Sequence, residues 1–297
     1  MSGKVKSEVY FSIIIPVFNS QATLRKCLDS IFIQDLLRTE VIVVDNGSSD
    51  KTWEFVREKY PLVKIVHNCN NLGAAYARNQ GINLAQGKYI IFLDSDTELE
   101  NSFFRKLNDK LKQLPLSVAA ISPKIINVQT KKIFSCGINI SSIYRAYDLG
   151  KDKLPDTFGE ICRIDGPNSC CAIFRKEYLE KIKEKSYFDE DFFFLFEDVD
   201  LVFRLKKNGY QSVFLPGLIC YHQGNSSNTS KQFRQFLCFR NRWYMVLKYN
   251  RGWGLIVFLA KSFLYDFLRT VYFMLSNRYF LRALGEIYRK SKFIKQV

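Results

Sequence analysis

Short apolar runs alternate with amphipathic stretches along the first hundred residues. The runs are rich in β-branched and aromatic side chains, which is typical of buried strands, and they lie at 11–16, 40–45, 63–67 and 89–93. The stretches at 22–32, 52–59 and about 70–85 fit helices between these strands. Strands that alternate with helices at this spacing predict βαβ units. We therefore predict an α/β fold, a Rossmann-like and mostly parallel sheet with helices on both faces.

Polar residues mark the expected ends of these elements. Asn19 or Ser20 is placed to cap the first helix, and Asp50 the second. The later pattern predicts helices at about 101–114 and from 176 to about 185, and a third that begins at Asp198 and is amphipathic over 201–207. It predicts strands near 118–122 and leading into 175, and edge strands at 213–216 and 218–222. Residues 125–164 fit only short strands and loops.

Two carboxylates directly follow the most apolar strand. Tyr89 to Leu93 leads into Asp94-Ser95-Asp96. The carboxyl end of a buried strand in an α/β sheet opens into the ligand crevice. Mg²⁺ is usually held by one or two carboxylates together with phosphate oxygens of the substrate. Asp94 and Asp96 are thus candidate ligands of a metal-bound nucleotide diphosphate, and the alternative is that Asp96 only caps a helix.

Charge is distributed unevenly along the chain. The formal net charge is +15, and residues 231–297 hold 14 Lys and Arg against Asp266 and Glu286. An anionic partner is therefore expected at the C-terminal segment. Because this segment is also apolar and aromatic, the pattern favours an anionic lipid surface and disfavours nucleic acid.

Other signals narrow the class of protein. The eight cysteines form no Cys-x-x-Cys pair, which argues against a zinc site and fits a reducing cytosol. The polar stretch before residue 11 and the short apolar run after it do not fit a secretory signal. The absence of Gly-x-Gly-x-x-Gly and of a P-loop in the first hundred residues disfavours a dinucleotide-binding fold and a P-loop NTPase.

The chain contains five short motifs, and their order resembles that of the motifs in a known protein family. They are Ser12-Ile-Ile-Ile-Pro-Val-Phe-Asn19, Val41-Ile-Val-Val-Asp45-Asn-Gly-Ser-Ser-Asp50, Asn71-Leu-Gly-Ala-Ala-Tyr-Ala-Arg78-Asn79, Phe92-Leu-Asp94-Ser-Asp96 and Phe194-Leu-Phe-Glu197-Asp198-Val-Asp-Leu201. Over about residues 12–224 the chain resembles family 2 glycosyltransferases, which have the A-type nucleotide-sugar transferase (GT-A) fold, and within them the rhamnosyltransferase-like group. The resemblance implies inverting transfer of a sugar, rhamnose among the candidates, from a UDP- or dTDP-linked donor to a hydroxyl of a lipid-linked or cell-surface glycan.

The resemblance also implies site residues. Pro16, Phe18 and Asp45 would hold the nucleobase, with Asp45 accepting the imide hydrogen; the alternative is a Pro-ended strand with an Asp that caps a turn. Arg78 would reach a phosphate or Asp94, or else be a solvated helix cation. His222 would be a further ligand of Mg²⁺ or Mn²⁺, or else only a partly buried histidine. The remaining motif residues expected at the donor are Asn19, Asn71 and Ser95.

A second acidic cluster follows an aromatic run. The acceptor hydroxyl must lose its proton as it attacks, so a carboxylate base is required. Asp198 begins a predicted helix, whose N-terminus favours the ionised form, and the preceding phenylalanines favour proton uptake through desolvation. We expect Asp198 to be the base, with Glu197 as its rival; the alternative is that both only cap the helix. His67 carries no expected chemistry.

The C-terminal segment predicts amphipathic helices. Between 255 and 275, Lys261, Asp266 and Arg269 fall within one arc together with Ser262. Charges at these positions disfavour a spanning helix. They fit a helix lying in the membrane interface with its cations toward the headgroups. The alternative is a helical unit packed on the catalytic domain or on the second subunit of a homodimer.

These patterns predict two domains. A catalytic domain spans 1–230, with a nucleotide-binding half at about 10–122 and an acceptor half at about 123–230. A membrane-associated tail spans 231–297, which places the protein on the cytoplasmic face of the cell membrane.

Two other functions stay open, a sugar-phosphate nucleotidyltransferase and an inactive nucleotide-sugar-binding membrane scaffold. The missing Gly-rich activation loop weighs against the first, and the intact carboxylates weigh against the second.

Overall fold

The computed structural model describes residues 9–36, 38–224 and 229–295. Strands and helices alternate through the first half of the chain, as the apolar pattern predicts. The elements up to residue 127 are β1 (Phe11–Val17), α1 (Gln21–Phe32), β2 (Thr39–Asp45), α2 (Thr52–Lys59), β3 (Lys64–His67), α3 (Ala74–Leu84), β4 (Tyr89–Leu93), β5 (Thr97–Leu99), α4 (Phe103–Gln113) and β6 (Val118–Asn127).

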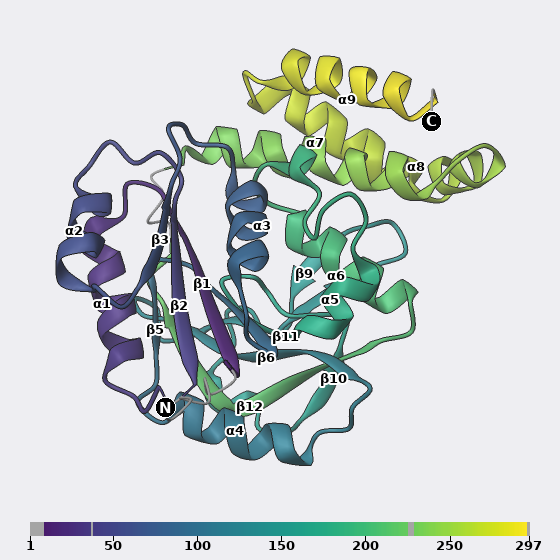
Figure 1. The fold of residues 1–297 in the computed structure, drawn as a ribbon. Coiled ribbons are helices and arrows are strands. Elements are labelled where there is room, and N and C mark those ends of the chain that lie inside the picture. Colours follow the sequence, from purple (N-terminus) through teal and green to yellow (C-terminus); the bar gives the residue numbers. More distant parts are fainter. Residues whose placement is uncertain (1–8, 37, 225–228, 296–297) are drawn as a thin grey trace.

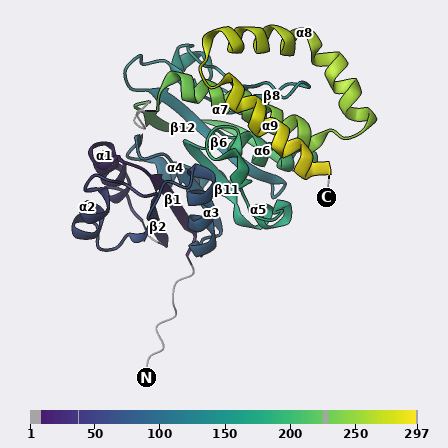
Figure 2. The same cartoon turned by 90° about the horizontal axis from the view of Figure 1, so that it is seen from above.

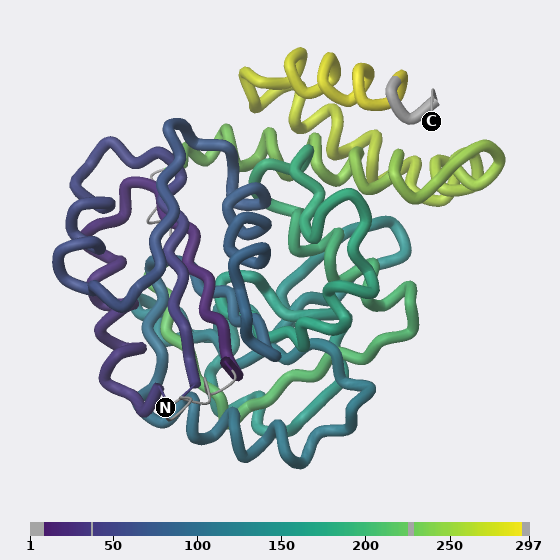
Figure 3. Tube along the Cα trace, viewed as in Figure 1, coloured from purple at the N-terminus to yellow at the C-terminus, as the bar shows by residue number. Residues whose placement is uncertain are grey.

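Shorter elements follow before the C-terminal helices. They are β7 (Ile133–Ser135), β8 (Ile138–Ile140), β9 (Ala146–Asp148), the 3₁₀ turn η1 (Pro155–Thr157), β10 (Cys162–Ile164), β11 (Cys171–Arg175), α5 (Lys176–Ile182), the 3₁₀ turn η2 (Glu190–Phe192), α6 (Glu197–Lys207) and β12 (Gln211–His222). The chain ends in α7 (Lys231–Tyr249), α8 (Trp253–Ser276) and α9 (Phe280–Lys295). Figure 3 follows the chain from the N-terminal strands to these last helices.

One central sheet organises the molecule, in the order β10-β12-β6-β11-β4-β1-β2-β3. The pairings place β3, β2, β1, β4, β6 and β12 in one direction, while β11 and β10 run against them. The prediction of a mostly parallel sheet is confirmed. Because the parallel strands end at the same edge, the residues that follow β1, β2, β4 and β12 come together there.

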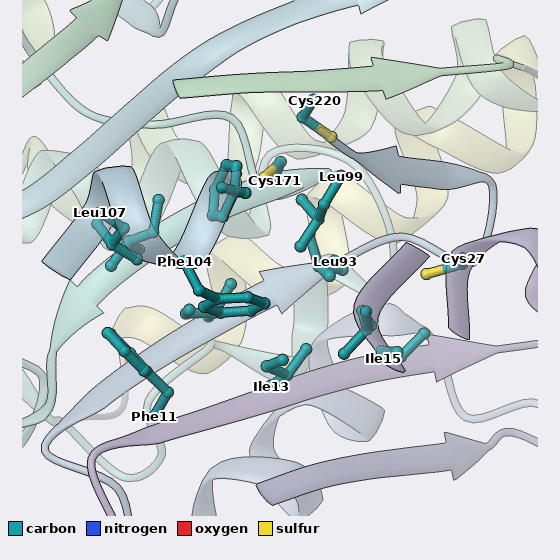
Figure 4. Packing of buried hydrophobic residues seen from close by; sticks show 14 of the residues in the cluster. Phe11, Ile13, Ile15, Cys27, Leu93, Leu99, Phe104, Leu107, Cys171 and Cys220 are labelled. Atoms are coloured by element: carbon teal, nitrogen blue, oxygen red, sulfur yellow. The ribbon is translucent and has the colours of Figure 1, made fainter. Parts of the chain in front are cut away.

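Helices cover both faces of this sheet (Figure 1). On one face, α1, α2 and α4 pack on alternate strand residues, including Ile13, Ile15 and Leu93. Figure 4 shows part of this cluster, in which Phe104 and Leu107 of α4 lie over β1 and β4. On the other face, α3, α5 and α6 pack on Ile14 and Phe92. The prediction of helices on both faces is confirmed.

The structure corrects several predicted elements. The two edge strands at 213–216 and 218–222 form one strand, β12, which lies inside the sheet between β10 and β6. Its register against β6 shifts between Leu215 and Ile219, so it passes Pro216 and Gly217 through an irregularity. β6 extends to Asn127, beyond the predicted end at 122.

The predicted helix ends also differ in detail. Ser20 occupies the position before α1, but its hydroxyl donates to the carbonyl of Phe18 and does not cap the helix. Asp50 does accept a hydrogen bond from the amide of Thr52, 3.0 Å away. Asp96 does not cap a helix, because β5 follows it. α6 begins at Glu197, one residue before the predicted start at Asp198, and both residues lie in its first turn.

The C-terminal helices form a layer at one end of the molecule, and α8 runs along its outer edge (Figures 1 and 2). α7 packs on the catalytic part of the chain and on α9. α8 also reaches the catalytic part, because the ring of Phe258 stacks on that of Tyr144. None of the described helices is both long and apolar enough to cross a bilayer.

The polar arc of α8 points inward. Ser262 and Asp266 are buried, and Asp266 forms an ion pair with the buried Arg242 of α7, with 2.5 Å between its Oδ1 and the guanidinium Nη1. Arg269 of the same arc donates to the carbonyl of Cys238 on α7 at 3.0 Å, so the expectation that the cations of this arc point to headgroups is wrong for Arg269. Lys261 is exposed. The opposite face of α8 is apolar and exposed, with Trp253, Ile256, Val257, Leu259, Phe263, Leu264, Phe267, Leu268, Tyr272, Met274 and Leu275.

Candidate active site

A cleft of about 540 Å³ opens at the carboxyl edge of the sheet. Side chains from distant parts of the chain line it. Most of the predicted site residues are among them, namely Pro16, Phe18, Asn71, Arg78, Asp94, Ser95, Asp96, Glu197, Asp198 and His222. Asn19 and Asp45 lie at the same edge but do not line the cleft.

Two carboxylates and one imidazole lie close together at the end of β4. Asp94, Asp96 and His222 each offer one ligand atom, and these atoms lie within 4.8 Å of one another. His222 is brought here because β12 pairs with β5, which follows Asp96 directly. Its Nε2 lies 3.2 Å from Asp96 Oδ1, and its ring packs 4.4 Å from that of Phe134. Burial tends to lower the pKa of His222, but the Asp96 and Asp94 carboxylates outweigh it, so the pKa is raised.

The donor atoms of this cluster fit a divalent cation. Two carboxylates and one imidazole are ligands that Mg²⁺ and Mn²⁺ accept. In the described part of the chain, His222 Nδ1 is a buried nitrogen without a hydrogen-bond partner. Burial raises the pKa of Asp94, and Arg78 opposes this rise without cancelling it. A cation would relieve the mutual repulsion of the two carboxylates.

Arg78 connects this cluster to the second acidic pair. It lies on α3 and is almost completely buried. Its Nη2 donates to Asp94 Oδ1 at 3.0 Å, and its Nη1 donates to Glu197 Oε1 at 2.5 Å. A guanidinium can bind two carboxylates at once through its planar set of donors. Arg78 therefore sets the spacing between the end of β4 and the start of α6.

Glu197 and Asp198 have different surroundings. Glu197 is buried, and burial raises its pKa to about 7 although Arg78 opposes the shift. Asp198 is partly exposed toward the cleft; it accepts hydrogen bonds from the amides of Val199 at 2.8 Å and Ser169 at 3.4 Å. Burial also raises the pKa of Asp198, against the pull of Arg78. Asp198 is thus held at the cleft wall with an elevated proton affinity, and Glu197 is held behind it by Arg78.

The residues at the ends of β2 and β3 form a separate network. Asp45 is fully buried; its Oδ1 accepts from the amide of Ser48 at 3.1 Å, and its Oδ2 lies 2.8 Å from His67 Nδ1. Asn19 has a positive φ of 51°, and its side chain accepts from the amide of Ser49 at 2.8 Å. Asn19 therefore joins the loop after β1 to the loop after β2. The contact of His67 with Asp45 was not predicted.

Asn46 is a further residue that the sequence pattern did not single out. It is buried and lines the cleft. Its amide donates to Asn71 Oδ1 and to the carbonyl of Gly73, each at 3.0 Å, and its oxygen accepts from the amide of Leu72. Its place beside Asp45 in the second motif was the one available signal. Asn46 fixes the loop before α3, and thereby Arg78, against the end of β2.

The wall opposite β4 is a strained loop. Phe193, Leu195 and Phe196 all have positive φ angles, between 64° and 74°. Side chains other than glycine rarely adopt this region, and such strain gathers at functional sites. Gly73 allows the loop to approach, because a Cβ there would lie 2.5 Å from the carbonyl oxygen of Phe193. This loop leads directly into Glu197 and Asp198.

Comparison with known proteins identifies the family. A sequence model of the family described as "Glycosyl transferase family 2" matches residues 12–183, more than half of the chain. The chain belongs to glycosyl transferase family 2. This match ends before Glu197, so the second acidic pair lies outside the matched residues. The narrower resemblance to a rhamnosyltransferase-like group is not confirmed.

Curated relatives match over a limited part of their length. An uncharacterized glycosyltransferase, YibD of Escherichia coli, is 36% identical over 111 residues, which are 36% of this chain and 32% of the relative. The poly-β-1,6-N-acetyl-D-glucosamine synthase of Staphylococcus epidermidis is 28% identical over 214 residues, 71% of this chain and 49% of the relative. The chain thus matches about a third to a half of the length of these relatives.

Solved structures share the fold at low sequence identity. S. aureus TarS residues 1–349 in complex with UDP-GlcNAc is 19% identical, with a TM-score of 0.58 over 95% of this chain and 81% of that one. GalNAc-T7 with UDP, GalNAc and Mn²⁺ is 15% identical, with a TM-score of 0.60 over 86% of this chain and 55% of that one. The expected GT-A fold is confirmed by these neighbours.

Proposed function

We propose that this chain is a metal-dependent, inverting glycosyltransferase that uses a nucleoside-diphosphate sugar, UDP- or dTDP-linked. The observation that carries the proposal is Arg78. Through this one side chain, the cluster of Asp94, Asp96 and His222 is fixed at a set distance from the pair of Glu197 and Asp198. Leaving-group stabilisation and proton removal need two such separate sites in one cleft.

The donor would lie along the carboxyl edge of the sheet. Asp94, Asp96 and His222 would hold Mn²⁺ or Mg²⁺, which supplies charge neutralisation for the departing diphosphate. Pro16 and Phe18 offer a surface for the nucleobase, and Asn71 and Ser95 line the path between base and diphosphate. Asp45 is fully buried beside this surface and outside the cleft lining, so in this structure it supports the loop after β2 through its bonds to Ser48 and His67.

The transfer step uses the opposite wall. Asp198 takes the proton from the acceptor hydroxyl, and the hydroxyl oxygen forms a bond to the anomeric carbon. The bond between that carbon and the diphosphate oxygen breaks, and its electron pair leaves with the nucleoside diphosphate. Attack from the face opposite the leaving group inverts the anomeric centre. Glu197, held by Arg78, orients the first turn of α6, on which Asp198 lies.

Features of the C-terminal helices support the proposed acceptor and place of action. The exposed apolar side chains of α8 are adjacent to one another. Single apolar residues scattered over a surface are normal, whereas a contiguous apolar surface marks a site of interaction. The segment 231–297 also holds an excess of Lys and Arg. An apolar helix face with surrounding cations suits the interface of an anionic membrane. We infer that the protein acts at the inner face of the cell membrane on a lipid-linked or cell-surface glycan.

A nucleotide-sugar screen tests the proposal. The full chain is melted with each of a set of UDP-, dTDP- and GDP-sugars, with Mn²⁺ and with EDTA. We expect at least one donor to raise Tm by several degrees with Mn²⁺ only, because a bound ligand stabilises the folded state. Transfer to a lipid-linked acceptor is then measured for that donor. If every donor leaves Tm unchanged, or the shift persists in EDTA, the proposal is wrong.

A further inference from the structure

A second cavity, of about 470 Å³, lies beside the cleft between α7 and α8. We refer to it as the basic pocket. Its polar lining includes Lys231, Arg234 and Arg269, and its apolar lining includes Phe239, Tyr272 and Phe273. Among the described residues, no Asp or Glu lines it. The pocket therefore combines positive charge with an aromatic floor.

The basic pocket is connected to the proposed chemistry on one side. Thr229 and Arg234 line both the pocket and the cleft. Glu197 and Asp198 line that same cleft. A ligand in the pocket would thus be close to the acidic pair.

The other side of the pocket meets the outer face of α8. Tyr272 lines the pocket and is 62% exposed. It belongs to the same exposed apolar face as Phe267, Leu268 and Leu275. A chain of apolar atoms can therefore run from the pocket onto the face that we assign to the membrane.

We propose that the basic pocket binds the phosphate-bearing head of a lipid-linked acceptor. The phosphate would lie against Lys231, Arg234 and Arg269, and the first apolar units would lie on Phe239 and Tyr272. Cations that surround a phosphate form charge-assisted hydrogen bonds with it. The sugar or hydroxyl beyond the phosphate then reaches Asp198. This proposal rests on the proposed glycosyltransferase function and narrows its acceptor to a lipid that carries a phosphate.

Binding of farnesyl phosphate to the full chain tests the pocket without turnover. Lys231→Gln and Tyr272→Ala are the test variants, because both side chains are exposed and lie outside the cleft lining. Arg234 is not chosen, because it lines the cleft as well. Lys292→Gln, an exposed lysine on α9, is the matched control. Farnesol and inorganic phosphate are measured beside farnesyl phosphate.

We expect Lys231→Gln to weaken farnesyl phosphate binding about tenfold, the effect of losing a hydrogen bond to a charged group. Tyr272→Ala should weaken it similarly, and Lys292→Gln should bind as the wild type does. Farnesol and inorganic phosphate should each bind at least about tenfold more weakly than farnesyl phosphate. Unchanged binding in both test variants, or equal binding of inorganic phosphate, overturns the pocket proposal. Mn²⁺-dependent donor binding, measured separately, decides the proposed function on its own.

A different observation carries a second proposal, about Asn241 of α7. This residue is fully buried, and the two hydrogens of its amide nitrogen are shared among the carbonyls of Phe192 at 2.9 Å, Phe194 at 3.0 Å and Leu195 at 2.5 Å. Arg240 adds a bond to the carbonyl of Phe192 at 3.0 Å. These carbonyls belong to the strained loop that leads into Glu197 and Asp198.

We infer that Asn241 is a positioning residue for Asp198, so that α7 is part of the catalytic unit rather than of a separable tail. A loop with several positive φ angles persists only when its surroundings over-determine it. Asn241 supplies this restraint from a helix that is outside the α/β fold. Its loss would release the loop and let Asp198 leave its place at the cleft wall.

The test compares Asn241→Ala with Asn250→Ala, both on or at the end of α7. Asn250 donates to the hydroxyl of Tyr144 at 3.3 Å and to the carbonyl of Val246 at 2.9 Å, and neither partner belongs to the loop, so Asn250→Ala is a matched loss of side-chain hydrogen bonds. We expect Asn241→Ala to lower kcat by about tenfold or more with KM for the donor nearly unchanged, and to speed hydrogen exchange at 193–198. Asn250→Ala should change Tm only. Equal kcat in the two variants, or unchanged exchange at 193–198, overturns the inference, and the exchange result is independent of whether the chain is a glycosyltransferase.

Discussion

Replacement of each acid of the second pair separates the proposed base from its neighbour. In Asp198→Asn, the amide oxygen can still accept from Val199, while the weaker bond from Ser169 at 3.4 Å is lost. The fold is therefore largely kept, and the proton acceptor is removed. Loss of a general base typically costs about 10²–10⁴-fold in rate. We expect kcat to fall by that order, which corresponds to roughly 3–5 kcal/mol in the barrier.

Glu197→Gln changes a different interaction. The bond from Arg78 Nη1 to Glu197 Oε1 stays, but its acceptor becomes neutral. A hydrogen bond between charged groups is worth about 1 kcal/mol more than a neutral one, so a rate loss of roughly fivefold to tenfold is expected. The kcat of this variant should thus exceed that of Asp198→Asn by at least about tenfold.

Three measurements on both variants test this reasoning. They are kcat at saturating donor, the Kd of the donor with Mn²⁺, and Tm. Donor Kd should change little in either variant, because neither acid belongs to the cluster at the end of β4. A lower kcat for Glu197→Gln than for Asp198→Asn would reverse the two roles. Normal kcat with lower Tm in both would make the pair structural.

Three further predictions concern other parts of the molecule. Mn²⁺ affinity should fall as the pH is lowered through the raised pKa of His222, because an imidazole that binds a metal must be neutral. Calorimetric titrations from pH 8 to pH 6 measure this dependence, and His222→Gln should make it weaker. Asn46→Ala should lower the free energy of unfolding by about 1–3 kcal/mol in urea titrations, whereas Asn101→Ala, at an exposed turn, should not. Phe263→Asp on α8 should weaken binding to anionic vesicles at least about tenfold, because burial of an apolar side chain in the membrane contributes about 1.5–3 kcal/mol to binding. The control is Leu116→Asp, a similarly exposed position on the catalytic part, which should bind vesicles as the wild type does.

The strands of the first half were predictable because each is an apolar run with a clear end. The apolar runs of β1, β2 and β4 are buried on both faces. The first two runs end near Pro16 and at Asp45, and Asp94 directly follows the third. β12 was not predicted as one strand, because Pro216 and Gly217 interrupt its pattern. Only the pairing with β6 shows that the strand continues past them with a shift in register.

The types of residue at the site could be predicted from the sequence, but the contacts between these residues could not. Asp94 and Asp96 follow a strand, so their approach to each other is local, whereas Arg78 and Glu197 are 119 positions apart. Their ion pair depends on how α3 and α6 pack on the same face of the sheet. The orientation of α8 shows the same limit. Its periodicity reveals a polar arc, but only the tertiary structure supplies Arg242 as the partner of Asp266.

Titration of UDP into the full chain tests the central claim most directly, with Mn²⁺ present or with EDTA, for the wild type and for Asp96→Ala. The cluster of Asp94, Asp96 and His222 is assigned to a cation that neutralises the diphosphate. The account predicts that the wild type binds UDP with Mn²⁺ and loses most of this affinity in EDTA. It predicts that Asp96→Ala binds weakly in both conditions while it keeps a cooperative melting transition. Equal UDP affinity of the wild type with Mn²⁺ and in EDTA, or full Mn²⁺-dependent binding by Asp96→Ala, would contradict it.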